Sequence, residues 1–132
     1  MTTNTQIQEA IFQQAGAYAA SVGLPISYPG VNFDQPNTGE WLELLFLPND
    51  YAGSQINTTG VTLPRGIFRI NACDSRKIGL KDATVNAEAV KAAFPIRTTI
   101  VDQVAVSKVP VLGMPMIEEG VIRIPVTIEY HG

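Results

Sequence analysis

The chain has 132 residues, a length that fits one domain and leaves little room for a second domain with its own core. Hydrophobic residues make up 45% and charged residues 16%, which excludes a highly charged, disordered chain. The net charge of -3 argues against nucleic-acid readout through a generally basic surface. A single cysteine and a single histidine exclude an internal disulfide and a multi-histidine zinc site.

The first residues lack both the basic residues and the continuous apolar stretch of a secretory signal. No apolar run approaches the roughly 18 residues of a membrane span. The sequence therefore predicts a protein made in a reducing cytoplasm, without a membrane partner.

Apolar residues recur every three or four positions between Thr5 and Val22, which predicts an amphipathic helix. Thr5 with Gln8 suits a capping box at its start, and Gly23 tolerates the left-handed backbone that ends many helices. The residues expected on the buried face are Ile7, Ile11, Ala15, Tyr18 and Val22.

Proline and glycine are dense between Pro25 and Gly39, so at most short strands are expected there, near 26–28 and 31–33. Residues 41–47 then run apolar on both faces apart from Glu43. This pattern predicts a central strand that is covered on both sides.

Residues 49–64 contain one charged residue, Asp50, and are rich in Gly, Ser, Thr and Asn. Loops of this length are uncommon inside compact domains and are usually functional, or disordered until something binds them. We expect residues 51–64 to be mobile in the free subunit and to contact a partner through Tyr51, Ile56 and Leu63. A hairpin tip without a role is the alternative.

Residues 65–74 alternate, which predicts a half-buried strand paired with 41–47 in a long hairpin. All nine basic residues lie from Arg65 onward, so every charged residue in positions 1–64 is acidic. Charge asymmetry of this kind marks interaction surfaces unless the two halves interleave in space. The candidate basic contacts are Arg65, Arg69, Arg76 and Lys77.

A second helix is expected between Gly79 and Pro95, and no third helix is predicted. Its apolar face would consist of Leu80, Ala83, Ala87, Val90 and Phe94. From Thr98 onward the period changes to two, which predicts strands, the last of them over 122–130. Pro125 lies on the polar face of that strand and predicts an edge position or a bulge, because proline cannot donate to a ladder.

Catalytic chemistry has little support in this sequence. His131 is next to last, a poor position for a general base, and Cys73 fits a small buried residue of its strand. No glycine-rich phosphate loop is present. No catalytic, cofactor-binding or metal-binding residue is assigned, because the carboxylates lack ligand-like spacing: Asp74, Asp82, Glu88, Glu118 and Glu119.

Several short strings occur in a characteristic order along almost the whole chain. They are Asn32-Phe33, Gly39-Glu40-Trp41-Leu42, Leu47-Pro48, Arg65-Gly66-Ile67-Phe68, Gly79 before a helix that ends at Phe94, and the closing Ile124-Pro125-Val126-Thr127-Ile128-Glu129-Tyr130. Through their order and spacing the sequence resembles the tail terminator, or minor tail, proteins of long-tailed bacteriophages, including the group catalogued as a phage-related domain of unknown function.

The resemblance implies a virion protein without enzymatic activity or cofactor. Such a protein forms a homo-hexameric ring on the completed tail tube, stops tube polymerisation and presents a surface for joining the head. Its partners would be copies of itself, the tail tube protein and a head-completion or connector protein. It would assemble in the host cytoplasm and lie at the end of the tail near the neck.

The implied fold is α+β, with residues 1–132 forming a single domain. Two helices pack on one face of a mixed, mostly antiparallel sheet, in the order helix, strands, helix, strands. A ring needs two different complementary patches on each subunit, which halves of opposite charge would suit. An edge strand with Pro125 would suit a subunit boundary.

Two other functions fit the same pattern. One is a different phage neck or tail-completion protein. The other is a small α+β enzyme or ligand-binding domain with its site under the long loop.

Overall fold

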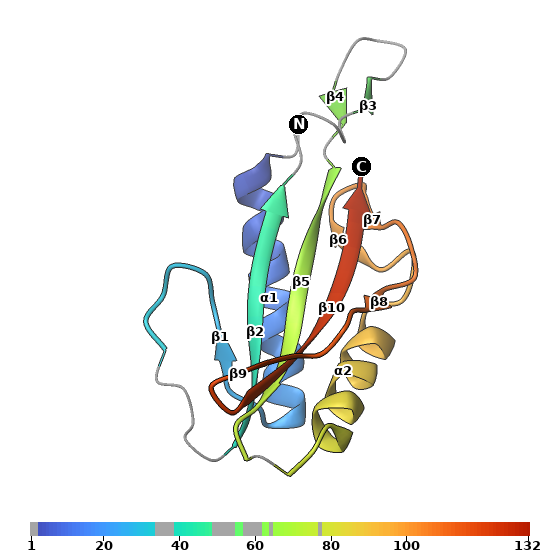
Figure 1. Cartoon of the computed structure of the whole chain (residues 1–132). Helices are drawn as coiled ribbons and strands as arrows, with labels where there is room; N and C mark the ends of the chain where they lie inside the picture. The colour runs from blue at the N-terminus through green and yellow to red at the C-terminus, as the bar shows by residue number, and fades with distance from the viewer. Residues whose placement is uncertain (1–2, 34–38, 49–54, 57–61, 64, 77) are drawn as a thin grey trace.

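The computed structural model describes residues 3–33, 39–48, 55–56, 62–63, 65–76 and 78–132. In this part of the chain two helices pack on one face of an eight-stranded sheet, as predicted (Figure 1). The predicted contact residues Tyr51 and Lys77 lie outside the described residues, as do the side chains of Ile56 and Leu63.

The first helix, α1 (Asn4–Val22), starts earlier than predicted. The backbone N–H of Gln6 donates to the Thr3 hydroxyl at 3.2 Å, and the backbone N–H of Thr3 donates to Gln6 Oε1 at 2.8 Å. The capping box is therefore formed by Thr3 and Gln6. Thr3 and the predicted Thr5 are each followed by a glutamine three residues later, as a capping box requires. The earlier start adds hydrogen-bonded residues to the helix.

The end of α1 is as predicted, since Gly23 has a left-handed backbone with φ of 74°. The buried face carries Ile7, Ile11, Ala15 and Ala19, with Tyr18 partly buried. Val22 was expected on this face and is exposed instead, because it is the last helical residue, where the chain turns away through Gly23.

The second helix, α2 (Lys81–Ala93), buries Ala83, Ala87 and Val90, and Phe94 follows it into the core. The prediction for Leu80 was wrong: it is exposed, because it lies one position before the first helical residue. Neither helix has the length and hydrophobicity required of a membrane-spanning segment.

The sheet has the strand order β1-β2-β5-β10-β7-β6, and β8 and β9 also pair with β10. The pair β1–β2 is parallel and the other pairs are antiparallel. Strands β3 and β4 form a separate two-stranded ladder. The bounds are β1 (Ile26–Ser27), β2 (Glu40–Pro48), β3 (Gln55–Ile56), β4 (Thr62–Leu63), β5 (Arg65–Asp74), β6 (Thr99–Val101), β7 (Val104–Val106), β8 (Val111–Leu112), β9 (Met116–Glu118) and β10 (Val121–His131).

The short strand expected near 31–33 is not formed. The N–H of Val31 donates to the carbonyl of Tyr28 at 3.2 Å, so this segment continues a turn after β1.

Strands β2 and β5 form the predicted long hairpin, and β10 pairs along the other side of β5. Cross-strand neighbours share a face, so Leu44, Ile70 and Val126 point toward the helices. Leu45, Arg69 and Thr127 point to the other side, which we call the open face. The expectation that β2 is covered on both sides is wrong at its end, since Leu47 is exposed on the open face.

Pro125 lies neither in an edge strand nor at a bulge of the β5–β10 pair, which corrects the sequence prediction. Strand β10 lies between β5 and β7, and Pro125 is buried opposite Asn71. Its carbonyl accepts the Gly113 N–H at 2.7 Å, on the side of β10 away from β5. The N–H that proline lacks would point to that same side, into the gap between the pairings of β8 and β9, so no ladder bond to β5 is lost.

The core lies between the sheet and the helices, where Phe94 contacts Phe68 edge-on at a ring distance of 5.6 Å. A smaller cluster on the open face contains Trp41, Cys73 and Val121. Trp41, Leu44, Phe68, Val90, Phe94 and Ile124 are buried, whereas Phe46 is only partly buried.

We expect Phe94→Ala to lower the free energy of unfolding by about 3–5 kcal/mol, because it leaves a cavity against Phe68. The control is Leu80→Ala, which removes a side chain that is 43% exposed and should cost less than about 1 kcal/mol. Urea denaturation measures both variants. Equal losses would show that the buried face of α2 is assigned wrongly.

Candidate interaction surface

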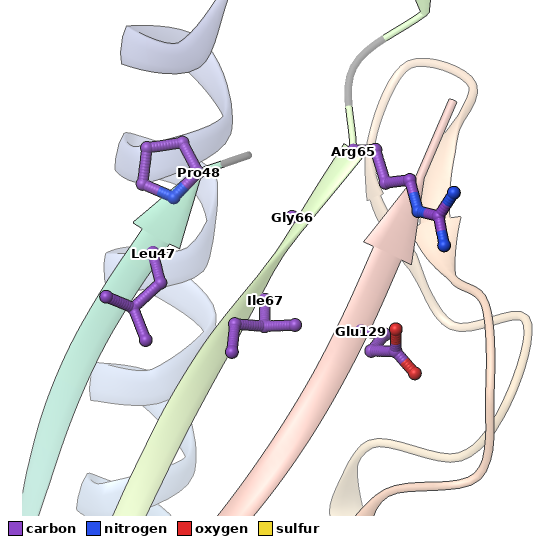
Figure 2. A pocket seen from close by; sticks show the side chains of 6 residues that line it. All are labelled: Leu47, Pro48, Arg65, Gly66, Ile67 and Glu129. Atoms are coloured by element: carbon purple, nitrogen blue, oxygen red, sulfur yellow. The ribbon is translucent and has the colours of Figure 1, made fainter. Parts of the chain in front are cut away.

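A shallow hollow lies at the end of the sheet where β2 ends and β5 begins (Figure 2). Its volume is about 260 Å³. Leu47, Ile67 and Glu129 are successive cross-strand neighbours, so their side chains lie side by side on the open face. We call this the hairpin-end hollow, and it is lined by Leu47, Pro48, Arg65, Gly66, Ile67 and Glu129.

The lining of the hairpin-end hollow is aliphatic with one charge of each sign. Leu47 is 45% exposed, and the carboxylate of Glu129 lies 3.3 Å from Lys108 Nζ. The hollow brings together no nucleophile and general base. An exposed aliphatic surface bordered by charges is typical of a protein contact.

The candidate residues from the sequence occupy different parts of the sheet. Arg65 lines the hairpin-end hollow, and Arg69 lies in the middle of the open face, where its Nε donates to Thr127 Oγ1 at 3.3 Å. Pro125 is buried beside them in β10. Arg76 lies just beyond the opposite end of β5. These four residues therefore do not form one site.

Arg76 binds three carboxylates at the end of the sheet opposite the hollow. Its Nη2 lies 3.0 Å from Asp74 and 2.8 Å from Asp82, and it also contacts Glu40. Asn86 Nδ2 donates to Glu40 at 2.6 Å. We call these five residues the Arg76 network, which connects α2 to the ends of β2 and β5.

Burial alone would raise the pKa of Asp74, but hydrogen bonds from Arg76 outweigh burial and hold this pKa below its usual value. The same contact with Asp74, followed by the charges of Glu40 and Asp82, raises the pKa of Arg76. The carboxylates lie close enough to suit a metal ion, yet the guanidinium binds all three. Their chemistry in this structure is that of an ion-pair network.

Sequence reasoning considered Asp74 and Asp82 and missed Glu40 as their neighbour. Glu40 joins them because β2 pairs with β5 in a register that places it opposite Asp74. The alternation of side chains in both strands shows which residues share a face. Only the register of the hairpin shows that Glu40 lies opposite Asp74.

Cys73 and His131 lie toward opposite ends of the β5–β10 pair, since Cys73 is opposite Arg123 and His131 is opposite Arg65. Burial, followed by the charge of Glu43, raises the pKa of the Cys73 thiol to about 12, so the thiol stays protonated at neutral pH. The predicted burial of Cys73 is confirmed. His131 is exposed at the end of β10, paired in the sheet opposite Arg65 and Ala105.

The two halves of the chain lie side by side in the sheet. Residues 1–64, which contain no Lys or Arg, supply β1 and β2, and the basic half supplies β5, β10, β7 and β6. At the seam Arg76 pairs with Glu40, and Arg123 Nε lies 3.7 Å from Glu43. Opposite charges therefore pair where the two halves meet, whereas toward the two edges of the sheet each half keeps its own sign of charge.

We expect Arg76→Met to destabilise the fold at pH 7, because it leaves three carboxylates together without their cation. In the wild type the lowered pKa of Asp74 contributes stability above its unfolded value of 3.8, and this contribution is lost as the pH falls through the folded value. Without Arg76, burial and like charges raise this pKa, so acidification stabilises the variant relative to the wild type.

The stability difference between the wild type and Arg76→Met should therefore be largest near pH 7 and shrink below about pH 4. Urea denaturation across this range measures it, with Lys91→Met, an exposed site on α2, as the control. A difference that stays constant with pH would contradict the role assigned to Arg76.

The family model of the phage tail terminator protein matches residues 6–130. One solved chain superposes with a TM-score of 0.77 at 20% identity, covering 99% of this chain and 96% of its own. A chain from the virion of a native gene transfer agent particle superposes with a TM-score of 0.64 at 21% identity, covering 94% and 92% respectively. No curated protein matches the sequence significantly.

At these identities the solved structures show the shared fold, and the family model shows the family. It confirms the resemblance, and a tail terminator is a structural protein, not a class of enzyme. The chain belongs to the phage tail terminator protein family and is a structural protein of a phage tail.

Proposed function

We propose that this protein forms a ring that caps the tail tube, stops its polymerisation and provides the surface to which the head is joined. The observation that carries the proposal is the family match over residues 6–130. The shared fold with a chain of a gene transfer agent virion supports it, because that protein is also part of a virion. The ring, which we propose to be a hexamer, would lie at the end of the tail near the neck after assembly in the host cytoplasm.

The tube would contact the hairpin-end hollow. This hollow combines an exposed leucine, a neighbouring isoleucine and charges of both signs. Residues 49–64 connect Pro48 to Arg65 at this same end of the sheet, so Tyr51, Ile56 and Leu63 belong to the same proposed contact. Arg69, Arg76 and Pro125 are engaged within the subunit, which makes Arg65 the basic residue best placed for the tube.

A ring that caps a tube must bind both the neighbouring subunits and the tube end. The hairpin-end hollow lies at one end of the long strands and the Arg76 network at the other. A contact at one strand end leaves the lateral sides of the subunit available for neighbours. This arrangement supports the proposed cap.

The decisive experiment measures tube length by electron microscopy in phage lysates that lack this protein. We expect tubes of irregular and excessive length and no joined heads. Purified protein added during assembly should restore a narrow length distribution. A different neck or tail-completion protein would leave tube length normal while blocking only the joining of heads, and that outcome would contradict the proposal.

Leu47→Asp tests the tube contact. A carboxylate in the hairpin-end hollow should weaken binding to tube ends by at least roughly tenfold, because it must be desolvated at the contact. The matched control is Leu80→Asp, at a leucine with 43% exposure against 45% for Leu47. Co-sedimentation with purified tubes measures binding, and equal binding by both variants would exclude the hollow as the contact.

A further inference from the structure

An apolar groove lies on the outer side of α1, at the β1 edge of the sheet. It has a volume of about 400 Å³. Gly16 lets Tyr28 lie directly on the helix, since a Cβ atom there would come within 2.5 Å of the Tyr28 hydroxyl. The ring of Phe12 packs beside Tyr28 at 5.3 Å. We call this the α1 groove, and it is lined by Phe12, Gln13, Gly16, Ala17, Tyr28 and Val31.

A second apolar surface lies on the outer side of α2. The end of this helix and the segment before β8 enclose a hollow of about 270 Å³. Two aliphatic side chains, Ile96 and Val109, are largely exposed there. We call this the α2 patch, and it consists of Ala92, Pro95, Ile96, Val109 and Pro110.

The α1 groove and the α2 patch lie on opposite sides of the subunit. In Figure 1 β1 lies at the left and α2 at the right. The groove is lined by residues of α1 and of the segment after β1, and the patch by residues at the end of α2 and before β8. Two different apolar surfaces on opposite sides are what a head-to-tail contact between identical subunits requires. Each subunit then uses both surfaces, and repetition of the contact closes a ring when the rotation fits.

The charges beside the two surfaces have opposite signs. Glu9 is the only charged residue in positions 3–33, and it lies one helical turn before Phe12 and Gln13 on α1. Around the α2 patch, Lys91 lines the hollow and Arg97 follows Ile96, against one acidic lining residue, Glu88. Lys108, which precedes Val109, is paired with Glu129 at 3.3 Å. Groove on groove or patch on patch would bring like charges together, whereas groove on patch joins unlike charges.

From this complementarity we infer that the occupant of the α1 groove is the α2 patch of a second copy of this chain. The inference rests on the proposed ring and names the surfaces that join its subunits. Val109 of one copy enters the groove beside Val31 and Tyr28 of the next, and the cations around the patch lie toward the acidic side of its neighbour.

Three valine-to-aspartate variants test this pairing with matched chemistry. Val31 in the groove is 60% exposed, Val109 in the patch is 56% exposed, and Val85 on α2, outside both surfaces, is 55% exposed. Val31→Asp and Val109→Asp should each lower the self-association constant by roughly 30-fold or more, because each places an unpaired carboxylate in the contact. Val85→Asp should assemble as the wild type does. Sedimentation velocity across a concentration series measures assembly, both free and on tail tubes.

Mixing the two defective variants gives a sharper result. The Val109→Asp chain keeps an intact groove and the Val31→Asp chain keeps an intact patch, so one junction can form between them. We expect the mixture to form a heterodimer and no larger species, although each variant alone stays monomeric. A two-fold symmetric contact would give no such complementation, and a mixture that stays monomeric overturns the head-to-tail pairing.

The remaining outcomes separate this inference from the proposed function. A wild-type ring that both variants leave intact overturns the inference and leaves the cap standing. A ring that both variants disrupt, but that does not limit tube length, supports the inference and overturns the cap. A wild-type chain that stays monomeric both free and on tubes overturns both.

Discussion

The register of three long antiparallel strands determines most of this structure. Strands β2, β5 and β10 pair along nearly their whole lengths, so one alternation of side chains continues across all three. A shift of one residue in either pairing would exchange the helix-facing and open faces of a strand. The core against α1 and α2, the hairpin-end hollow and the position of Glu40 beside Asp74 all depend on this register.

The open face differs from the helix face in what its side chains contact. Toward one end Trp41, Cys73 and Val121 form a small buried cluster, whereas Leu47 remains exposed toward the other. Within the described residues no helix covers this side of the sheet. A tail protein works within an assembly, and aliphatic side chains left exposed on a sheet face and on the flanks of both helices suit contacts made there. The proposed tube contact and the proposed subunit contacts use separate surfaces, because the hairpin-end hollow lies at a strand end and the two apolar surfaces lie beside the helices.

Several residues that looked like contacts in the sequence serve the subunit itself. Arg76 pairs with the acidic Glu40 of β2 where the two halves meet, and the carbonyl of Pro125 accepts the Gly113 N–H inside the sheet. A basic residue or a proline in a sequence shows what chemistry is available. Its neighbours in space decide whether that chemistry is used within the subunit or offered to a partner.

The sequence alone determined the two helices, the β2–β5 hairpin, the long final strand and the family, because helical and strand periodicities and the order of short strings are local properties of the chain. The tertiary structure decided which contacts join distant segments. Glu40 lies beside Asp82, Pro125 lies in an interior strand, and the α1 groove combines Gly16 with Tyr28. None of these is visible in a pattern, because each depends on strand order and on helix packing against the sheet, which the sequence specifies only through the free energy of the whole fold.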